Sequence, residues 1–322
     1  MKMKLSLVVP CYNEAENVAV FQDAVIEAFA GCGYDYEIVF VDDGSRDTTM
    51  FQLKKIFRAQ KCPVKVVSFS RNFGKEAAIY AGLKQTSGQY VTLIDADLQQ
   101  RPEIARDMVK ILEENPEYDL VAAYQDRRGE SKVLSFFKKA FYKVINHLSD
   151  VNLHADASDF RTMRRCVADS IIELGEYHRF SKGIFAWVGF NTCFIPYTAC
   201  ERAAGESKWN FRNLFNYAIE GIIGYSTKPL RMATFLGGFT AVIAFLYLIN
   251  VVLERLVGGI DIPGYATIVV LILFLGSMQL FCIGIIGEYV GRTFEQSKQR
   301  PVYIPREILT YEEMEKPSQN KA

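Results

Sequence analysis

Histidine is scarce in this sequence, and cysteine is present without pairing. The three histidines, at positions 147, 154 and 178, are too far apart along the chain to predict a histidine metal cluster. The seven cysteines are scattered and form no Cys-x-x-Cys pair, which favours reduced thiols over a disulfide framework or a zinc site. Lysine plus arginine and aspartate plus glutamate each number 37, so no excess of positive charge indicates a nucleic-acid partner.

Common nucleotide-binding and targeting patterns are missing as well. No Gly-x-Gly-x-x-Gly follows a predicted strand and no Walker A sequence occurs, which argues against dinucleotide-binding and NTPase folds. The N-terminus is basic at Met1–Lys4, but the apolar run Leu5–Val9 is short and Pro10 ends it. We therefore predict a buried strand at this position rather than a signal peptide.

The first part of the chain alternates short apolar segments with amphipathic helical segments. Near-continuous apolar strands between such helices predict a parallel sheet that is covered on both faces. The expected strands are 5–9, 37–41, 64–69 and 89–94, and the expected helices are 15–30, 48–60 and 75–86. Polar residues follow each strand, and ligands of open α/β sheets bind at this carboxyl edge.

Two long apolar segments, Met232–Leu253 and Ala266–Val290, are nearly free of charge. Each has about 20 residues or more, which is enough to span the hydrocarbon of a bilayer. A buried core helix is the alternative for either one alone, but the short Gly-rich connection Val257–Gly264 predicts a transmembrane hairpin. We therefore divide the chain into a cytosolic domain (1–228), a hairpin (229–291) and a cytosolic tail (292–322).

The distribution of basic residues predicts the orientation of this hairpin. Lys228 and Arg231 precede the first span, Arg292 follows the second, and the connection carries Arg255 as its one base. The positive-inside rule then places both ends in the cytosol of a multi-pass protein of the plasma membrane. An acidic residue near a span end, such as Glu288, is expected to face a partner or the interface rather than lipid.

Further segments of the second half bear on membrane contact and assembly. Ser131–Leu148 has an apolar stripe with lysines beside it, which fits a helix on the membrane surface or an ordinary core-facing helix; Trp209–Tyr225 is a weaker second case. Glycines at 284, 287 and 291 allow close helix packing within or between protomers. With a possible short strand at Val302–Ile304, they favour a homo-oligomer, a dimer or a tetramer. The tail is otherwise expected to be irregular and, from about Glu312, disordered.

The motif Asp95-Ala96-Asp97 follows the fourth predicted strand and is the central candidate site. Two carboxylates at a strand exit can turn toward a hard cation such as Mg²⁺ or Mn²⁺, with Gln99 as a third oxygen ligand or a neighbouring group. Solvated aspartates in a turn are the alternative. Diphosphate oxygens would complete the metal shell.

Polar motifs close the other three strands too. Pro10-Cys11-Tyr12-Asn13-Glu14 reads as the edge of a nucleoside pocket or as a helix start capped by Asn13. Asp42-Asp43-Gly44-Ser45 reads as a carboxylate for a nucleobase or ribose, or as an ordinary turn. Arg71-Asn72-Phe73-Gly74-Lys75 reads as a cation near the base or diphosphate, or as a basic turn.

Together these motifs resemble family 2 glycosyltransferases with the GT-A fold. The later segments Ser158-Asp159-Phe160-Arg161, His178-Arg179-Phe180, Ala186–Phe190 and Arg202-x-x-Gly205-x-Ser207-Lys208-Trp209, followed by two spans, resemble the polyprenyl-phosphate glycosyltransferases. The fold class implied is α/β: a Rossmann-like, mostly parallel GT-A domain with a two-helix transmembrane hairpin. The Gln-x-x-Arg-Trp signature of processive polysaccharide synthases is missing.

The resemblance implies roles for individual residues. Asp159 matches the candidate catalytic carboxylate. Implied nucleotide-sugar contacts are Pro10, Tyr12, Asn13, Glu14, Asp43, Lys75, Asp95, Ala96 and Asp97, and implied metal residues are Asp95, Asp97 and Gln99. Implied acceptor or diphosphate contacts are Arg127, Arg128, Ser135, Arg161, Arg202 and Lys208.

The expected reaction is inverting transfer from a nucleotide-sugar, a UDP-sugar above all, to undecaprenyl phosphate at the cytosolic membrane face. Mg²⁺ or Mn²⁺ is the expected cofactor, and the bilayer and a flippase are expected partners, with no nucleic acid. Another lipid acceptor such as diacylglycerol is the alternative among enzymes. A catalytically inactive scaffold that binds a nucleotide-sugar is the alternative of another class.

Overall fold

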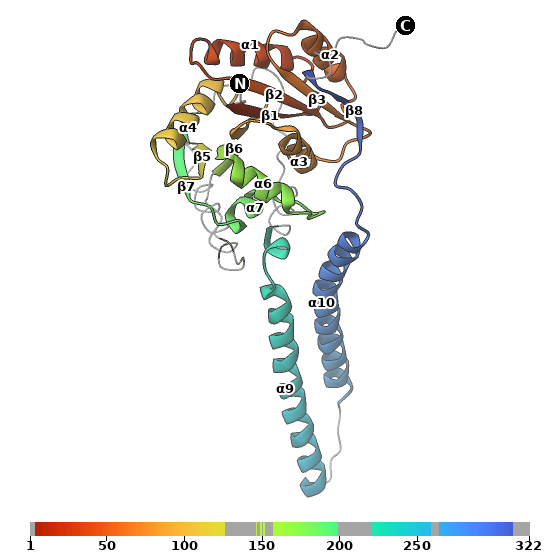
Figure 1. The fold of residues 1–322 in the computed structure, drawn as a ribbon. Helices are drawn as coiled ribbons and strands as arrows, with labels where there is room; N and C mark the ends of the chain where they lie inside the picture. The colour runs from red at the N-terminus through yellow and green to blue at the C-terminus, as the bar shows by residue number, and fades with distance from the viewer. Residues whose placement is uncertain are drawn as a thin grey trace.

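The computed structural model describes residues 4–125, 146, 149, 151, 157–198, 221–258 and 264–311. An α/β domain carries two long helices that project from it side by side (Figure 1). The elements in chain order are β1 (Leu5–Cys11), α1 (Val18–Phe29), β2 (Tyr36–Asp42), α2 (Thr49–Ala59), β3 (Val64–Phe69), α3 (Lys75–Gln85), β4 (Tyr90–Leu93), α4 (Pro102–Glu114), β5 (Leu120–Gln125), β6 (Ala157–Arg164), α6 (Arg165–Glu173), α7 (Ser181–Trp187), β7 (Thr192–Tyr197), α9 (Lys228–Gly258), α10 (Tyr265–Ser297) and β8 (Pro305–Leu309).

One mixed sheet organises the domain, in the order β7-β5-β6-β4-β1-β2-β3-β8. Its centre, β4-β1-β2-β3, is parallel as predicted. Strand β6 runs antiparallel to both β4 and β5, and β7 is parallel to β5. The antiparallel β6 matters for function because it brings a later segment of the chain alongside the end of β4.

Successive residues of the central strands are buried against opposite helical layers. Leu7 packs in the cluster that contains α1, α2 and α4, whereas its neighbour Val8 packs against α3 and α6. Side chains alternate between the two faces of a strand, so a strand covered on both sides is apolar at most positions. This explains why β1 is apolar at every position except Ser6, whose hydroxyl donates a hydrogen bond to the buried Glu37.

The tail forms an edge strand, which begins directly after the segment that the sequence favoured. Strand β8 pairs antiparallel with β3, with Val66 opposite Leu309. Val302–Ile304 is not itself a strand: Tyr303 stacks on Phe69 with ring centroids 4.9 Å apart, and the Ile304 carbonyl accepts a hydrogen bond from the Ser70 N–H at 3.0 Å. The described part of the tail is therefore ordered against the sheet, and the sheet contains residues from beyond the hairpin.

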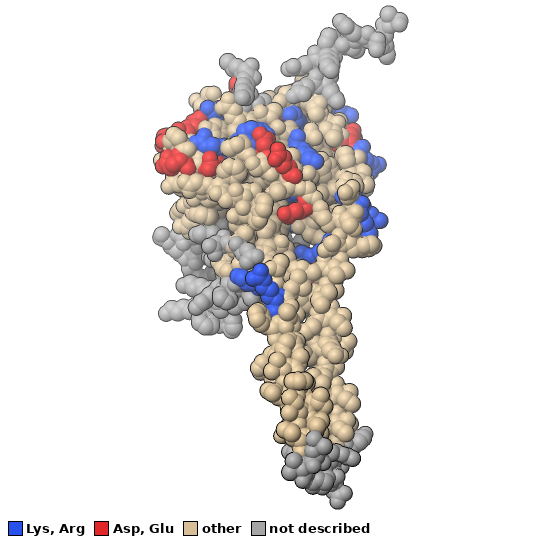
Figure 2. Space-filling view, turned by 60° about the horizontal axis from the view of Figure 1, so that its bottom comes forward, with Lys and Arg blue, Asp and Glu red and all other residues tan. Residues whose placement is uncertain are grey.

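The two projecting helices match the predicted hairpin and are longer than the predicted spans. The segments 228–253 and 267–297 are long and apolar enough to cross a membrane, and none of their apolar stretch is buried in the protein. On the face drawn in Figure 2, the described residues of the two projecting helices show no charged side chain along most of their length, and basic residues lie where the helices join the domain. Glu288 lies near the end of the second span and contacts Arg292, one turn away, at 3.4 Å, so it has the polar partner that was expected.

The glycines of α10 are not used for packing inside the protomer. A Cβ atom added at position 284, 287 or 291 would meet no neighbouring atom within 4 Å. Close packing within the protomer was therefore wrong as an explanation for them, and packing between protomers stays a prediction. Ser131–Leu148 lies outside the described residues apart from 146, and most of Trp209–Tyr225 is outside them too.

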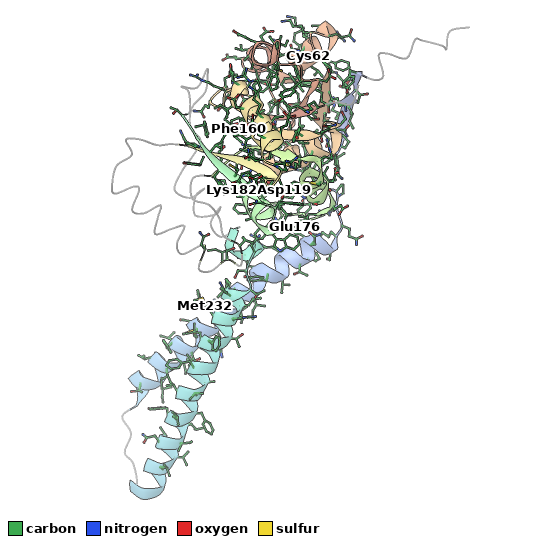
Figure 3. The ribbon with its side chains drawn as sticks, turned by 60° about the vertical axis from the view of Figure 1, so that its left-hand side comes forward. Cys62, Asp119, Phe160, Glu176, Lys182 and Met232 are labelled. Carbon is green, nitrogen blue, oxygen red and sulfur yellow. The ribbon has the colours of Figure 1, made fainter. Side chains whose placement is uncertain are left out.

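The C-terminal part of α10 is hydrogen-bonded to the α/β domain. The Gln296 side chain accepts a hydrogen bond from the Tyr177 N–H at 2.8 Å and donates one to the Gly175 carbonyl at 3.1 Å, and His178 contacts Glu295. The Tyr289 hydroxyl donates to the Ser226 carbonyl at 2.7 Å. Figure 3 shows Glu176 of the same loop at this junction.

Candidate active site

The candidate site lies at the carboxyl ends of β1, β2 and β4, next to β6. Leu93 of β4 pairs with Arg161 of β6 in antiparallel register. Extending this register by two residues puts position 95 opposite position 159. The pairing of two strands thus brings the carboxylates of Asp95 and Asp159 to the same place, although they are far apart in the sequence.

Lys75 joins these two carboxylates. Its ammonium lies 2.8 Å from Oδ1 and 3.1 Å from Oδ2 of Asp95, and 3.1 Å from Oδ2 of Asp159. Lys75 is the first residue of α3, directly after Gly74, so the start of this helix aims the side chain across the ends of the strands. The sequence pointed to each of these residues separately, and the structure brings them together.

The charges around Asp159 fix its ionisation. Burial raises the pKa of its carboxyl, but the positive charges of Lys75, Lys182 and Arg161 outweigh burial and lower that pKa to about 2. For Lys75, burial lowers the pKa, and the carboxylates of Asp95 and Asp159 raise it above its ordinary value. Asp159 is therefore a carboxylate, and Lys75 an ammonium, at any pH near neutrality.

Glu76 is a neighbouring residue that the sequence did not indicate. Its carboxylate accepts hydrogen bonds from the Ser181 N–H, at 3.0 Å to Oε2, and from the Ser181 hydroxyl at the start of α7. Burial and the charge of Asp159 raise the pKa of Glu76 to about 7, although Ser181 and Arg179 oppose this. Glu76 therefore changes charge near neutral pH next to a carboxylate that does not.

The segment after β4 turns sharply at Leu98, whose φ is 58°. Gln100 contacts Asp95: its side-chain oxygen accepts a hydrogen bond from the Asp95 N–H at 3.0 Å, and its amide donates one to Oδ2 at 3.3 Å. Gln99 donates its N–H to Oδ1 of Asp97 at 3.2 Å. The sequence analysis considered Gln99 and not Gln100, because the turn at Leu98 that brings Gln100 to Asp95 has no signal in the local sequence.

The ends of β1 and β2 are bonded to each other. Asn13 donates its N–H to the Ser45 hydroxyl at 2.9 Å, and its side-chain oxygen accepts from the Arg46 N–H at 2.9 Å. The Glu14 N–H donates to the Thr49 hydroxyl at 2.8 Å. Asn13 does not cap the following helix, as one alternative had it, since α1 starts at Val18 after Asn17. These bonds join the loops that follow β1 and β2, and nucleotide contacts by Pro10, Tyr12, Asn13 and Glu14 stay a prediction.

Asp43 is buried and holds a loop. It accepts hydrogen bonds from the side chain of Asn72 at 2.9 Å and from the N–H groups of Phe73 and Gly74 at 2.6 and 3.0 Å. Burial raises its pKa, and the two N–H groups partly offset this. Its visible role is to fix the Asn72–Gly74 turn, from which Lys75 extends, and a direct nucleotide contact stays a prediction.

Comparison with known proteins agrees with this architecture. Residues 6–172 match the family model "Glycosyl transferase family 2", and residues 228–293 match the "GtrB C-terminal hairpin". The chain belongs to glycosyl transferase family 2. Its α/β domain is therefore a GT-A transferase domain, and the resemblance inferred from the motifs is confirmed.

Relatives match over nearly the whole chain. The chain is 42% identical over 304 residues to a putative glycosyltransferase CsbB of Bacillus subtilis, covering 94% of this chain and 91% of that protein. It is 42% identical to the bactoprenol glucosyl transferase of Shigella phage SfV, covering 94% and 98%. It is 38% identical to a prophage bactoprenol glucosyl transferase homolog of Escherichia coli, covering 95% and 99%.

The predicted acceptor and diphosphate contacts of this transferase are mostly beyond the structural description. Arg127, Arg128, Ser135, Arg202 and Lys208 lie outside the described residues. Arg161 is described and is buried: its guanidinium donates to the Ser158 carbonyl at 2.8 Å and lies over the Phe185 ring, 3.8 Å from the centroid. Its charge helps to lower the pKa of Asp159, and a contact of Arg161 with the acceptor or diphosphate stays a prediction.

The donor atoms of the transferase site suit a hard divalent cation. Asp95, Asp97 and Gln99 offer oxygen atoms, which Mg²⁺ and Mn²⁺ prefer. Among the described residues, no group of three His, Cys, Asp or Glu side chains is already arranged to hold a metal ion. A metal would therefore take few ligands from the protein and the others from an anionic substrate or water, as is usual for Mg²⁺ with phosphates.

Gly44 provides a prediction about the loops of the site. It has φ +64°, and a Cβ there would lie 2.7 Å from the Asn72 nitrogen and 2.8 Å from the Arg71 oxygen. We expect Gly44→Ala to destabilise the protein by about 1–3 kcal/mol and to lower transfer, because the two loops must separate. Gly33→Ala is the matched control, since Gly33 has φ +73° with no atom within 4 Å.

Thermal unfolding in detergent and the transfer rate of both variants are the measurements. Gly33→Ala should show backbone strain alone, about 1 kcal/mol, and an unchanged rate. Equal losses in the two variants would mean that contact with the Arg71–Asn72 backbone is unimportant.

Proposed function

We propose that this protein transfers a sugar, with inversion, from a nucleotide-sugar to a polyprenyl phosphate at the cytosolic face of the membrane. UDP is the nucleotide and undecaprenyl phosphate the acceptor that we favour. The observation that carries the proposal is the cluster Asp95–Lys75–Asp159 at the sheet edge of a transferase domain with a membrane hairpin. The relatives named bactoprenol glucosyl transferase support this acceptor.

The donor side of the site has to stabilise a leaving diphosphate. A divalent cation at Asp95 and Asp97 would neutralise the charge that develops there. The Lys75 ammonium lies within 3.1 Å of both carboxylates and adds a positive charge to the site. A charge already in position stabilises a transition state without reorganisation, and such groups are typically the largest single contribution to catalysis.

The acceptor side needs little proton transfer. A phosphate monoester has a second pKa of about 6, so the acceptor is mostly dianionic at neutral pH. Asp159, with a pKa of about 2, is a poor base and a stable negative charge. We infer that it stabilises the positive charge that develops on the sugar and orients the cations Lys75 and Arg161. Attack opposite to the diphosphate gives inversion.

The hairpin holds the site close to the bilayer, where the phosphate of a lipid acceptor can reach it. Its helices, which associate with the membrane, end at the transferase domain through Gln296 and Tyr289, so the catalytic edge stays near the bilayer surface. A long prenyl chain can then stay in the hydrocarbon while its phosphate reaches the protein. The plasma membrane, the cytosolic side, and assembly into a dimer or tetramer belong to this proposal.

A transfer assay tests the function. Membranes containing the wild type or Asp159→Asn are supplied with a panel of radiolabelled nucleotide-sugars, Mg²⁺ or Mn²⁺, and either undecaprenyl phosphate or diacylglycerol. Asp159-dependent label in the undecaprenyl lipid is the expected result. Label in diacylglycerol alone would contradict the acceptor, and no label with any donor would favour a non-catalytic scaffold.

Orientation gives a separate prediction. In a variant in which all seven native cysteines are replaced, a cysteine at Gly259 should react with an impermeant maleimide on intact cells. A cysteine at Lys228 should react only after permeabilisation, because the basic span ends stay in the cytosol. Labelling of Lys228→Cys in intact cells would reverse the orientation.

A further inference from the structure

The contact between Lys75 and the Asp95 carboxylate has a consequence for metal binding. Both Asp95 oxygens lie within 3.1 Å of the ammonium, and Oδ2 also accepts the Gln100 amide at 3.3 Å. A carboxylate offers about four lone-pair positions on its two oxygens, so these donors already use most of them. The carboxylate that is expected to bind the metal is thus already bonded to a positive charge of the protein.

A divalent cation and an ammonium interact unfavourably at the same carboxylate. Mg²⁺ binds oxygen at about 2.0–2.1 Å, and so would lie a few ångströms from an ammonium that keeps its place. Like charges at such a separation repel, and the side chains of Lys75 and Asp95 are 45% and 33% exposed, which weakens the repulsion without removing it. Either the ammonium moves away or the metal binds more weakly.

Lys75 has a second partner that lets it move away. Asp159 accepts the same ammonium at 3.1 Å, so the Lys75 side chain can give up Asp95 and still have a carboxylate beside it. Before a metal arrives, the ammonium offsets the repulsion between the two carboxylates that the β4–β6 register brings together. A neutral side chain at position 75 would leave that repulsion unbalanced.

We propose that Lys75 is a resident counter-ion that competes with the divalent cation for Asp95. Metal alone then binds weakly, and tight binding requires an anionic donor that brings further oxygen ligands. The inference deepens the proposed function, on whose metal position it rests. It assigns Lys75 the control of metal occupancy, in addition to any contact with the diphosphate.

Binding of Mn²⁺ without any substrate tests this. The free ion is measured by electron paramagnetic resonance during titration of the purified full chain in detergent. Lys75→Gln should bind Mn²⁺ about tenfold more tightly than the wild type, because one nearby positive charge is removed. Lys75→Arg, which keeps the charge, should bind as weakly as the wild type. Lys84→Gln is the matched control, since Lys84 lies at the far end of α3 over the Tyr80 ring.

A second substitution locates the ion. Adding Asp97→Asn to Lys75→Gln should abolish the gain in affinity. The inference is overturned if Lys75→Gln binds Mn²⁺ no more tightly than Lys84→Gln, if Lys75→Arg also gains affinity, or if no variant shows Asp97-dependent binding. Neither nucleotide-sugar nor acceptor is present, so an error in the proposed acceptor would not change this outcome.

Discussion

Replacing Asp159 by asparagine should lower the transfer rate by about 10²–10³-fold, and the loss should be similar from about pH 6 to 9. The reason is electrostatic. The pKa of Asp159 is lowered to about 2 by Lys75, Lys182 and Arg161 despite its burial, so the wild-type residue is ionised throughout that range. Its titration therefore contributes no pH dependence, and the variant lacks the same charge at every pH.

An essential base would behave differently. If Asp159 removed a proton from the acceptor, the variant should recover as the phosphate ionises by itself above its second pKa of about 6. Recovery to the wild-type rate at high pH would contradict our interpretation, and full activity at every pH would contradict both. Asp169→Asn, an exposed substitution on α6, is the control that should leave the rate unchanged.

Glu76 has to be considered in this comparison. The charge of Asp159 helps to raise the pKa of Glu76 to about 7, so its removal lets Glu76 ionise at a lower pH. The profiles of the two proteins can therefore differ modestly around neutrality. Above about pH 8, Glu76 is ionised in both, and this range decides between a base and a fixed charge.

Replacing Asp97 by asparagine should remove most activity, by about 10²-fold or more, because the diphosphate would lose its neutralising cation. A chelator should silence the wild type, and added Mg²⁺ or Mn²⁺ should restore it. Initial rates over a metal titration are the measurement. Asp107→Asn on α4, where Asp107 contacts its neighbour Arg106, is the matched control and should keep a normal metal requirement.

Two results would contradict the metal position. One is full turnover of the wild type in excess chelator. The other is an Asp97→Asn protein whose metal requirement and rate at saturating metal both equal those of the wild type. A shift in the metal requirement with a preserved maximal rate would instead mean that Asp97 contributes to affinity alone.

The central strands could be predicted from the sequence because helices cover both faces of the sheet, and strands buried on both faces are mostly apolar. Strands β1 to β4 were found in this way, with bounds within a few residues. Strands β6 and β8 could not be found in the same way. β6 reads Ala-Ser-Asp-Phe-Arg-Thr-Met-Arg, and β8 reads Pro-Arg-Glu-Ile-Leu, so neither has a continuous apolar run. They are strands because long-range pairing with β4, β5 and β3 satisfies their backbone.

The site shows the same limit. The motifs identified Asp95, Asp159 and Lys75 as candidates, yet their contact depends on the antiparallel register of β4 and β6, which local sequence does not encode. The burial of Asp43 could not be predicted from the sequence either, because it depends on the approach of the Arg71–Gly74 loop. The sequence thus identified the candidate charged residues, and the pairing of distant strands determined which of them are in contact.

Strand β8 has a practical consequence for anyone who wants a water-soluble catalytic fragment. Because the chain crosses to the hairpin and then returns to pair with β3, truncation after Thr227 would discard the outermost strand along with the hairpin. The backbone of β3 would then be an open edge, which is a template for aggregation. The stacking of Tyr303 on Phe69 would be lost as well. A fragment designed by internal deletion, with a flexible linker that rejoins Thr227 to Arg300, would keep the edge closed.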